Sequence, residues 1–133
     1  MDNCVIDFFK EMGFYNHDYF TKLSHNTLII NKDYEEIKEF VGFYPDTNKL
    51  VLPKIKTYRD MLIWVHEYSH ALFPNNPDEI FPSIMEVYFI NTYIKDPKVI
   101  DELIEYTKSE INNSVDYEHT IAKRIKLNSI KDN

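Results

Sequence analysis

The pentapeptide from His66 to His70 reads His-Glu-Tyr-Ser-His, a combination of residue types that can carry out metal-dependent hydrolysis. In an α-helix, residues four positions apart lie on the same face, so His66 and His70 can direct two imidazole nitrogens to one metal ion. Zinc accepts such a pair among its four ligands. Glu67 projects from nearly the same face, where its carboxylate can hold a water molecule and take its proton. The pattern therefore predicts a zinc site with Glu67 as its general base.

The residues around this motif predict a helix over 57–73. Thr57 can serve as its N-cap, Asp60 three positions later fits a capping-box pattern, and Pro74 marks its end. The helix is expected to bury one face in a core and to turn the other towards a cleft. The apolar face is predicted to carry Met61, Leu62, Val65, Ser69 and Leu72, and the other face Ile63, His66, Glu67 and His70.

A zinc site of this kind needs a third protein ligand, and the next segment offers two glutamates. The Pro-Asn-Asn-Pro stretch before Asp78 predicts a turn, and Asp78 is expected to cap a second helix. Glu79 and Glu86 are seven residues apart and fall on nearly the same helix face. One can bind the metal while the other hydrogen-bonds a ligand histidine. Spacing alone leaves the choice open, because a helix that begins only at Pro82 would favour Glu86 as the ligand.

These stretches resemble the zinc-binding core of the thimet oligopeptidase and oligoendopeptidase F type of metallopeptidase, which is gluzincin-like. In that family the zinc helix has a Thr-x-x-Asp-like start and carries His-Glu-x-x-His-Ala-Leu, as residues 57–60 and 66–72 do here. The third ligand of the family begins a pattern like Glu-Val-Pro-Ser-Ile-Leu-Met-Glu-Tyr-Phe. Residues 79–89 read Glu-Ile-Phe-Pro-Ser-Ile-Met-Glu-Val-Tyr-Phe, with Pro-Ser displaced by one place.

The resemblance implies a zinc ion bound by His66, His70 and Glu79, and Glu67 as the general base. It also implies that Glu86 is a carboxylate near the site. It covers about residues 57–93 and departs from the family in two respects. The first departure is the short connection, because only eight residues separate His70 from Glu79 where the family has a much longer segment.

The second departure concerns the residues that steady the transition state. The family uses a later stretch in which a histidine and several tyrosines lie near glycines. This chain has 2 Gly, both early, and Tyr117 with His119 is its only comparable late pair. His119 can also be interpreted as an ordinary surface or capping histidine. The same interpretation applies to His17 and His25, because none of the three has metal-ligand spacing.

Length and patterning predict an α+β fold in a single small zincin-like domain over residues 1–133. The chain has 133 residues, 44% of them hydrophobic and 15% aromatic, which suffices for one compact core. A short N-terminal sheet or hairpin is expected before the zinc helix, and three further helices after it. The candidate edge strand for pairing with substrate is 50–55. Other expected elements are a helix over 2–12, a strand over 27–31, helical turns over 34–40, a hairpin over 41–53, and helices that begin at Asp96-Pro97 and Ser114, the last reaching Ile125.

Charge and cysteine content limit the partners and the compartment. The formal net charge is −7, which argues against nucleic acid as a partner, and no basic run indicates an anionic membrane. Cys4 is the one cysteine, so no intramolecular disulfide can form, which fits a reducing compartment. No signal peptide or membrane-spanning run is evident. We expect a cytoplasmic protein whose oligomeric state the sequence leaves open.

The function predicted from these features is that of a zinc metalloendopeptidase, a hydrolase that acts on a peptide or an unfolded protein segment. Three alternatives remain open. One is a regulatory protease of the ImmA/IrrE type, which cleaves a single repressor and is similar in length with a hairpin before its zinc helix. Another is a degenerate zinc-binding domain that has lost its transition-state residues. The third is an interaction protein with an accidental motif, which would bind no stoichiometric metal.

Overall fold

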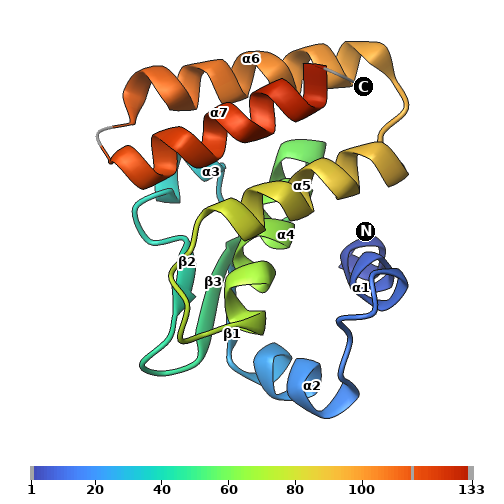
Figure 1. Cartoon of the computed structure of the whole chain (residues 1–133). Coiled ribbons are helices and arrows are strands. Elements are labelled where there is room, and N and C mark those ends of the chain that lie inside the picture. Colours follow the sequence, from blue (N-terminus) through green and yellow to red (C-terminus); the bar gives the residue numbers. More distant parts are fainter. Residues whose placement is uncertain (1, 115, 132–133) are drawn as a thin grey trace. The chain divides into compact units, whose positions relative to one another are not determined.

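The computed structural model describes residues 2–114 and 116–131, which form seven helices and one three-stranded sheet (Figure 1). The expected α+β class is therefore confirmed, and the zincin-like arrangement stays a prediction. No helix in these two ranges has the length and apolar character needed to cross a bilayer. The elements are α1 (Asp2–Glu11), α2 (His17–His25), β1 (Thr27–Ile30), α3 (Tyr34–Ile37), β2 (Gly42–Tyr44), β3 (Lys49–Pro53), α4 (Tyr58–Leu72), α5 (Ile80–Tyr93), α6 (Pro97–Asn113) and α7 (Tyr117–Lys131).

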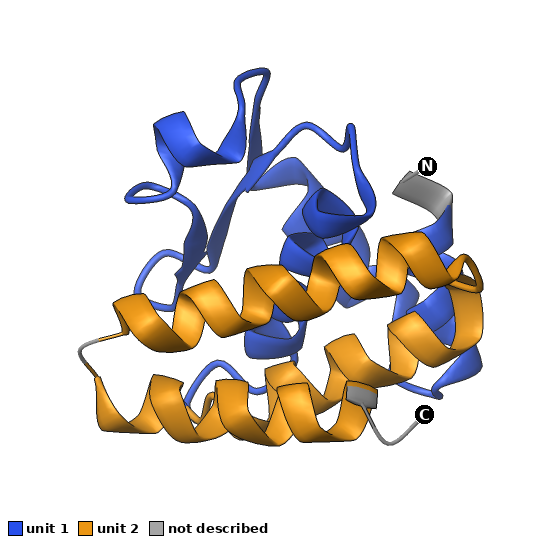
Figure 2. Cartoon of the chain, turned by 90° about the horizontal axis from the view of Figure 1, so that it is seen from above, with its two compact units in different colours: residues 1–77 blue, residues 78–133 orange. Residues whose placement is uncertain are grey.

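The chain divides into two compact units, residues 1–77 and 78–133 (Figure 2). The first unit contains the sheet and the helices from α1 to α4, and the second contains α5, α6 and α7. The zinc motif belongs to the first unit, and both candidate third ligands belong to the second. That the two units form a single domain stays a prediction from sequence.

The sheet of the first unit has the strand order β1-β3-β2. β2 and β3 form the predicted hairpin, with Gly42 opposite Val51 in an antiparallel pair. β1 pairs in parallel with the other side of β3, with Thr27 opposite Leu50. β3 is therefore the central strand, and residues 50–53 are buried. The expectation that 50–55 forms an edge strand is wrong, because β1 occupies that side; the edges are β1 and β2.

α4 begins and ends where the sequence predicts. The Asp60 backbone N–H donates to Thr57 Oγ1 over 3.2 Å, and the Thr57 N–H donates to Asp60 Oδ2 over 3.2 Å, which completes a capping box. The helix ends at Leu72, before Pro74. One further bond ties it to the sheet, because the buried indole of Trp64 donates from Nε1 to the carbonyl oxygen of Pro53 over 2.7 Å.

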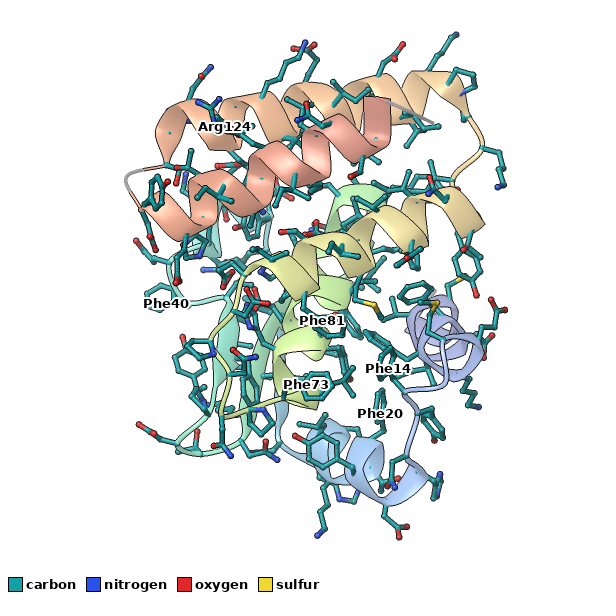
Figure 3. All side chains as sticks on the ribbon, in the orientation of Figure 1. Phe14, Phe20, Phe40, Phe73, Phe81 and Arg124 are labelled. Carbon is teal, nitrogen blue, oxygen red and sulfur yellow. The ribbon has the colours of Figure 1, made fainter. Side chains whose placement is uncertain are left out.

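Aromatic rings join the first two helices to α4. Phe9 of α1, Phe20 of α2 and Tyr68 of α4 lie within 6.0 Å of one another by ring centroid, and the Phe20 and Tyr68 rings are stacked. Phe14 and Phe73, both labelled with Phe20 in Figure 3, form an edge-on pair with centroids 6.4 Å apart. These contacts fix the buried side of α4 and so determine which face carries the two histidines.

The capping box supplies a direct test of what fixes the start of α4. Thr57→Ala removes the side-chain acceptor of the Asp60 N–H and should lower the free energy of unfolding by about 1 kcal/mol. Urea unfolding followed by circular dichroism measures this loss. Thr21→Ala, at an exposed position inside α2, is the matched control and should change stability by less than about 0.5 kcal/mol. Equal effects of the two substitutions would show that the cap does not stabilise α4.

The second unit is a three-helix arrangement in which α7 packs against both α5 and α6 (Figure 2). Two side-chain pairs connect α5 to α7. Glu79, just before α5, contacts His119, and Glu86, within α5, contacts Lys126. Both pairs are 40 residues apart in sequence, which means that α5 and α7 run parallel, with α6 returning between them in sequence (Figure 1). The buried apolar residues of this unit are Met85, Val87, Phe89, Ile90, Ile94, Leu103, Ala122 and Ile130.

The helix boundaries of the second unit are partly as predicted. Asp96 caps α6 by accepting from the Lys98 N–H, and Pro97 is its first residue, as expected. α7 continues to Lys131 instead of ending at 125. Ser114 was expected to cap this last helix but is the C-cap of α6. Asp116 takes the capping role instead, because its side chain accepts from the Glu118 N–H over 3.0 Å.

Candidate metal centre

His66 and His70 lie one turn apart on α4, and their ring centroids are 4.9 Å apart. Both side chains are half-buried, as are Ile63 and Glu67 on the same face. The opposite face is buried through Met61, Leu62, Val65 and Ser69. The buried face predicted for this helix is therefore confirmed, except that Leu72 is half-buried, and the cleft expected beside the other face stays a prediction.

Glu67 lies between the two histidines along α4 and is also half-buried. Its carboxylate makes no hydrogen bond or ion pair with the residues that the structure describes. A carboxylate that no protein donor holds can bind and deprotonate water. The role of Glu67 as a general base stays a prediction.

The last turn of α4, which carries His70, is held from a second helix of the same unit. Tyr19 of α2 donates its hydroxyl hydrogen to the carbonyl oxygen of Ala71. Burial raises the pKa of this hydroxyl, against a smaller lowering by its hydrogen bond with Asn48, so Tyr19 remains a donor at neutral pH. The sequence did not predict α2, and the contribution of Tyr19 to the site was missed with it.

Glu79 is buried at the start of α5, in the second unit. α5 begins at Ile80, so Pro82 lies inside its first turn and the helix does not start only at that proline. Asp78 accepts from the backbone N–H groups of Ile80 and Phe81, at 3.0 and 3.2 Å, which is the capping role expected of it. The glutamate is thus positioned by a capped helix start.

His66, His70 and Glu79 form a group that can hold a metal ion. Each offers one ligand atom, and these atoms lie within 4.8 Å of one another. Tetrahedral zinc with bonds of about 2.0–2.1 Å places its ligand atoms about 3.4 Å apart, which is within that limit. Two imidazoles and one carboxylate are also a donor set that zinc accepts with a fourth position open. The residues present therefore fit the predicted zinc ion.

Glu86, the alternative third ligand, has a different partner. Lys126 Nζ lies 2.7 Å from Glu86 Oε1, and the two side chains are only 4% and 5% exposed. Nearby Lys123 pairs with Glu110 of α6 at 3.0 Å. Burial favours a lower pKa for Lys123, but the charges of Glu86 and Glu110 and the hydrogen bond with Glu110 outweigh it and raise that pKa. Glu86 of α5 thus forms a buried ion pair with Lys126 of α7, and Glu79 is the glutamate in the group that can hold a metal ion.

His119 lies beside Glu79. This contact was not expected from the interpretation of His119 as an ordinary surface or capping histidine. Its Nε2 is 3.2 Å from Glu79 Oε1, and its Nδ1 is 2.7 Å from Asp116 Oδ2. Tyr117, the other member of the late pair, is 78% exposed. A sequence signal existed, because His119, Lys123 and Lys126 have helical spacing and repeat the seven-residue interval of the two glutamates.

Comparison with known proteins gives no match: no family model fits the chain, and neither a curated protein nor a solved structure shows significant similarity to it. The function is therefore argued from the site alone.

Proposed function

We propose that this protein is a zinc-dependent metallopeptidase in which His66, His70 and Glu79 bind the metal and Glu67 is the general base. The observation that carries the proposal is the group of three ligand atoms within 4.8 Å. Its two histidines flank a glutamate on one half-buried helix face.

The roles of the residues follow from their chemistry. When bound, zinc would supply a Lewis acid that polarises the scissile carbonyl and lowers the pKa of water to about 7. The carboxylate of Glu67 takes the proton from the attacking water and then delivers it to the leaving amine. His66 and His70 stay on one face because α4 is fixed by its capping box and by Trp64.

The proposed substrate is a peptide or an unfolded protein segment in an extended conformation. Such a chain can pair with an open sheet edge through its main chain. In this sheet the strands available for that pairing are β1 and β2, because β3 is paired on both sides. β1 also exposes Leu28 and Ile29, at 48% and 47%, which offers apolar contacts to a bound segment.

Metal content tests the proposal first. The wild-type protein should bind about one zinc per chain, whereas His70→Ala should retain almost none under the same dialysis because it leaves two protein ligands. Inductively coupled plasma mass spectrometry gives the stoichiometry. His17→Ala, which removes an exposed histidine of α2, is the matched control and should bind zinc as the wild type does. Absence of stoichiometric zinc from the wild type would overturn the site assignment.

A non-catalytic zinc-binding domain is the second candidate function. The observation in its favour is that the chain has 2 Gly, so the glycine- and tyrosine-containing stretch expected from the resemblance is missing. This candidate expects the same zinc stoichiometry but no turnover of any substrate. A regulatory protease would instead cleave a single protein and leave a diverse peptide library intact. Peptide-library and protein-substrate assays therefore separate the three possibilities.

A further inference from the structure

The side chain of Glu79 is held by a pair of residues on and just before α7. His119 contacts Glu79 Oε1 through Nε2, at 3.2 Å, and contacts Asp116 Oδ2 through Nδ1, at 2.7 Å. The three residues all lie in the second unit, and their contacts join the start of α5 to the start of α7. The two ring nitrogens of His119 thus connect the buried carboxylate of Glu79 to the exposed carboxylate of Asp116.

The ring of His119 is fixed in orientation from its outer side. Asp116 also accepts from the Glu118 N–H, so its carboxylate is itself tied to the first turn of α7. The hydrogen bond with His119, and then that with the Glu118 N–H, lowers the pKa of Asp116, which keeps this group a carboxylate acceptor. An imidazole held in this way by a carboxylate can rotate little, so its Nε2 stays directed at Glu79.

We propose that Asp116 and His119 are positioning residues for the metal ligand Glu79. His119 holds Oε1 and so would leave the other oxygen of the same carboxylate, Oε2, for a metal ion. This inference rests on the proposed zinc site. Partners of this kind orient a ligand and typically change metal affinity by about 10- to 100-fold when they are removed.

Zinc affinity of the full-length protein, measured by competition with a chromophoric chelator, tests the role of His119. His119→Phe should weaken zinc binding by about 10- to 100-fold without changing the stoichiometry. His119→Gln, whose amide nitrogen can take the place of Nε2, should restore affinity to within about threefold of the wild type. Asp116→Asn should give an intermediate loss, and because Asp116 is exposed this variant tests the inference even if a His119 variant folds poorly. His25→Phe, at an exposed histidine of α2, is the control and should have no effect.

Two further measurements separate positioning from a general loss of structure. The visible absorption spectrum of the Co²⁺-substituted protein should change in His119→Phe and return towards the wild-type spectrum in His119→Gln. In the presence of Glu79→Gln, adding His119→Phe should weaken metal binding no further, because His119 acts through Glu79. If the wild type binds zinc and His119→Phe binds it equally tightly with an unchanged Co²⁺ spectrum, this inference alone is overturned. If the wild type binds no zinc, the proposed function is overturned with it.

Discussion

Replacing Glu67 with glutamine should lower peptide turnover by about 100- to 10,000-fold while leaving about one zinc per chain. The range is that of general acid–base catalysis by a positioned side chain. Glutamine has nearly the same shape, so α4 and the two histidines should keep their positions, but an amide cannot accept the proton of water. Initial rates on a fluorogenic peptide library, measured together with metal content, give the result.

The control for this experiment is Glu102→Gln, which removes an exposed carboxylate of α6. It should retain the full rate and the full metal content. If Glu67→Gln keeps the wild-type rate, Glu67 is not the base and the hydrolysis has another origin. If zinc is present in both proteins but neither cleaves the library or a candidate protein substrate, the non-catalytic zinc-binding domain becomes the better proposal.

α4 could be predicted from sequence because the signals that define it are local. Thr57 and Asp60 are three residues apart and form the capping box by themselves, and Pro74 ends the helix without help from elsewhere. The helical period then assigns His66 and His70 to one face in any packing. Short local patterns also predicted β1, the hairpin and the start of α6.

The missed features depend on contacts between distant segments. The hairpin shows that β2 and β3 pair, but only the parallel addition of β1 makes β3 central, and nothing local in Lys49–Pro53 encodes that neighbour. α2 is a nine-residue helix with two buried residues, so its apolar period is too brief to be distinctive. The one local signal for its start is the N-cap Asn16, whose side chain accepts from the Tyr19 N–H.

The choice between Glu79 and Glu86 shows the same limit within the site. Both have the same residue type and nearly the same helix face, so the sequence treats them as equivalent. The two glutamates differ in their partners on α7. Lys126 pairs with Glu86 and His119 contacts Glu79, and each partner is 40 residues away in sequence. Only the parallel packing of α5 and α7 brings these pairs together.

The pair of Glu86 and Lys126 should therefore determine the stability of the second unit. Lys126→Met should lower the free energy of unfolding by about 3–5 kcal/mol, because it removes the buried lysine charge that lies 2.7 Å from Glu86 Oε1. The neighbouring charge of Lys123 offsets part of this cost and places the expected loss at the lower end. Urea unfolding of the full chain measures the effect, and Arg124→Met, at an exposed position of the same helix, should change stability by less than about 0.5 kcal/mol.

The double variant Glu86→Leu with Lys126→Met distinguishes a paired charge from a packing effect. Replacing both charges with apolar groups of similar size removes the buried carboxylate together with the lysine, so the double variant should recover most of the loss and reach within about 1 kcal/mol of the wild type. If it is less stable than Lys126→Met alone, the buried pair stabilises the unit by more than electrostatic compensation. Because Glu86 is not in the metal-binding group, zinc stoichiometry should be unchanged in the double variant. A loss of zinc there would mean that Glu86, and not Glu79 alone, supports the metal.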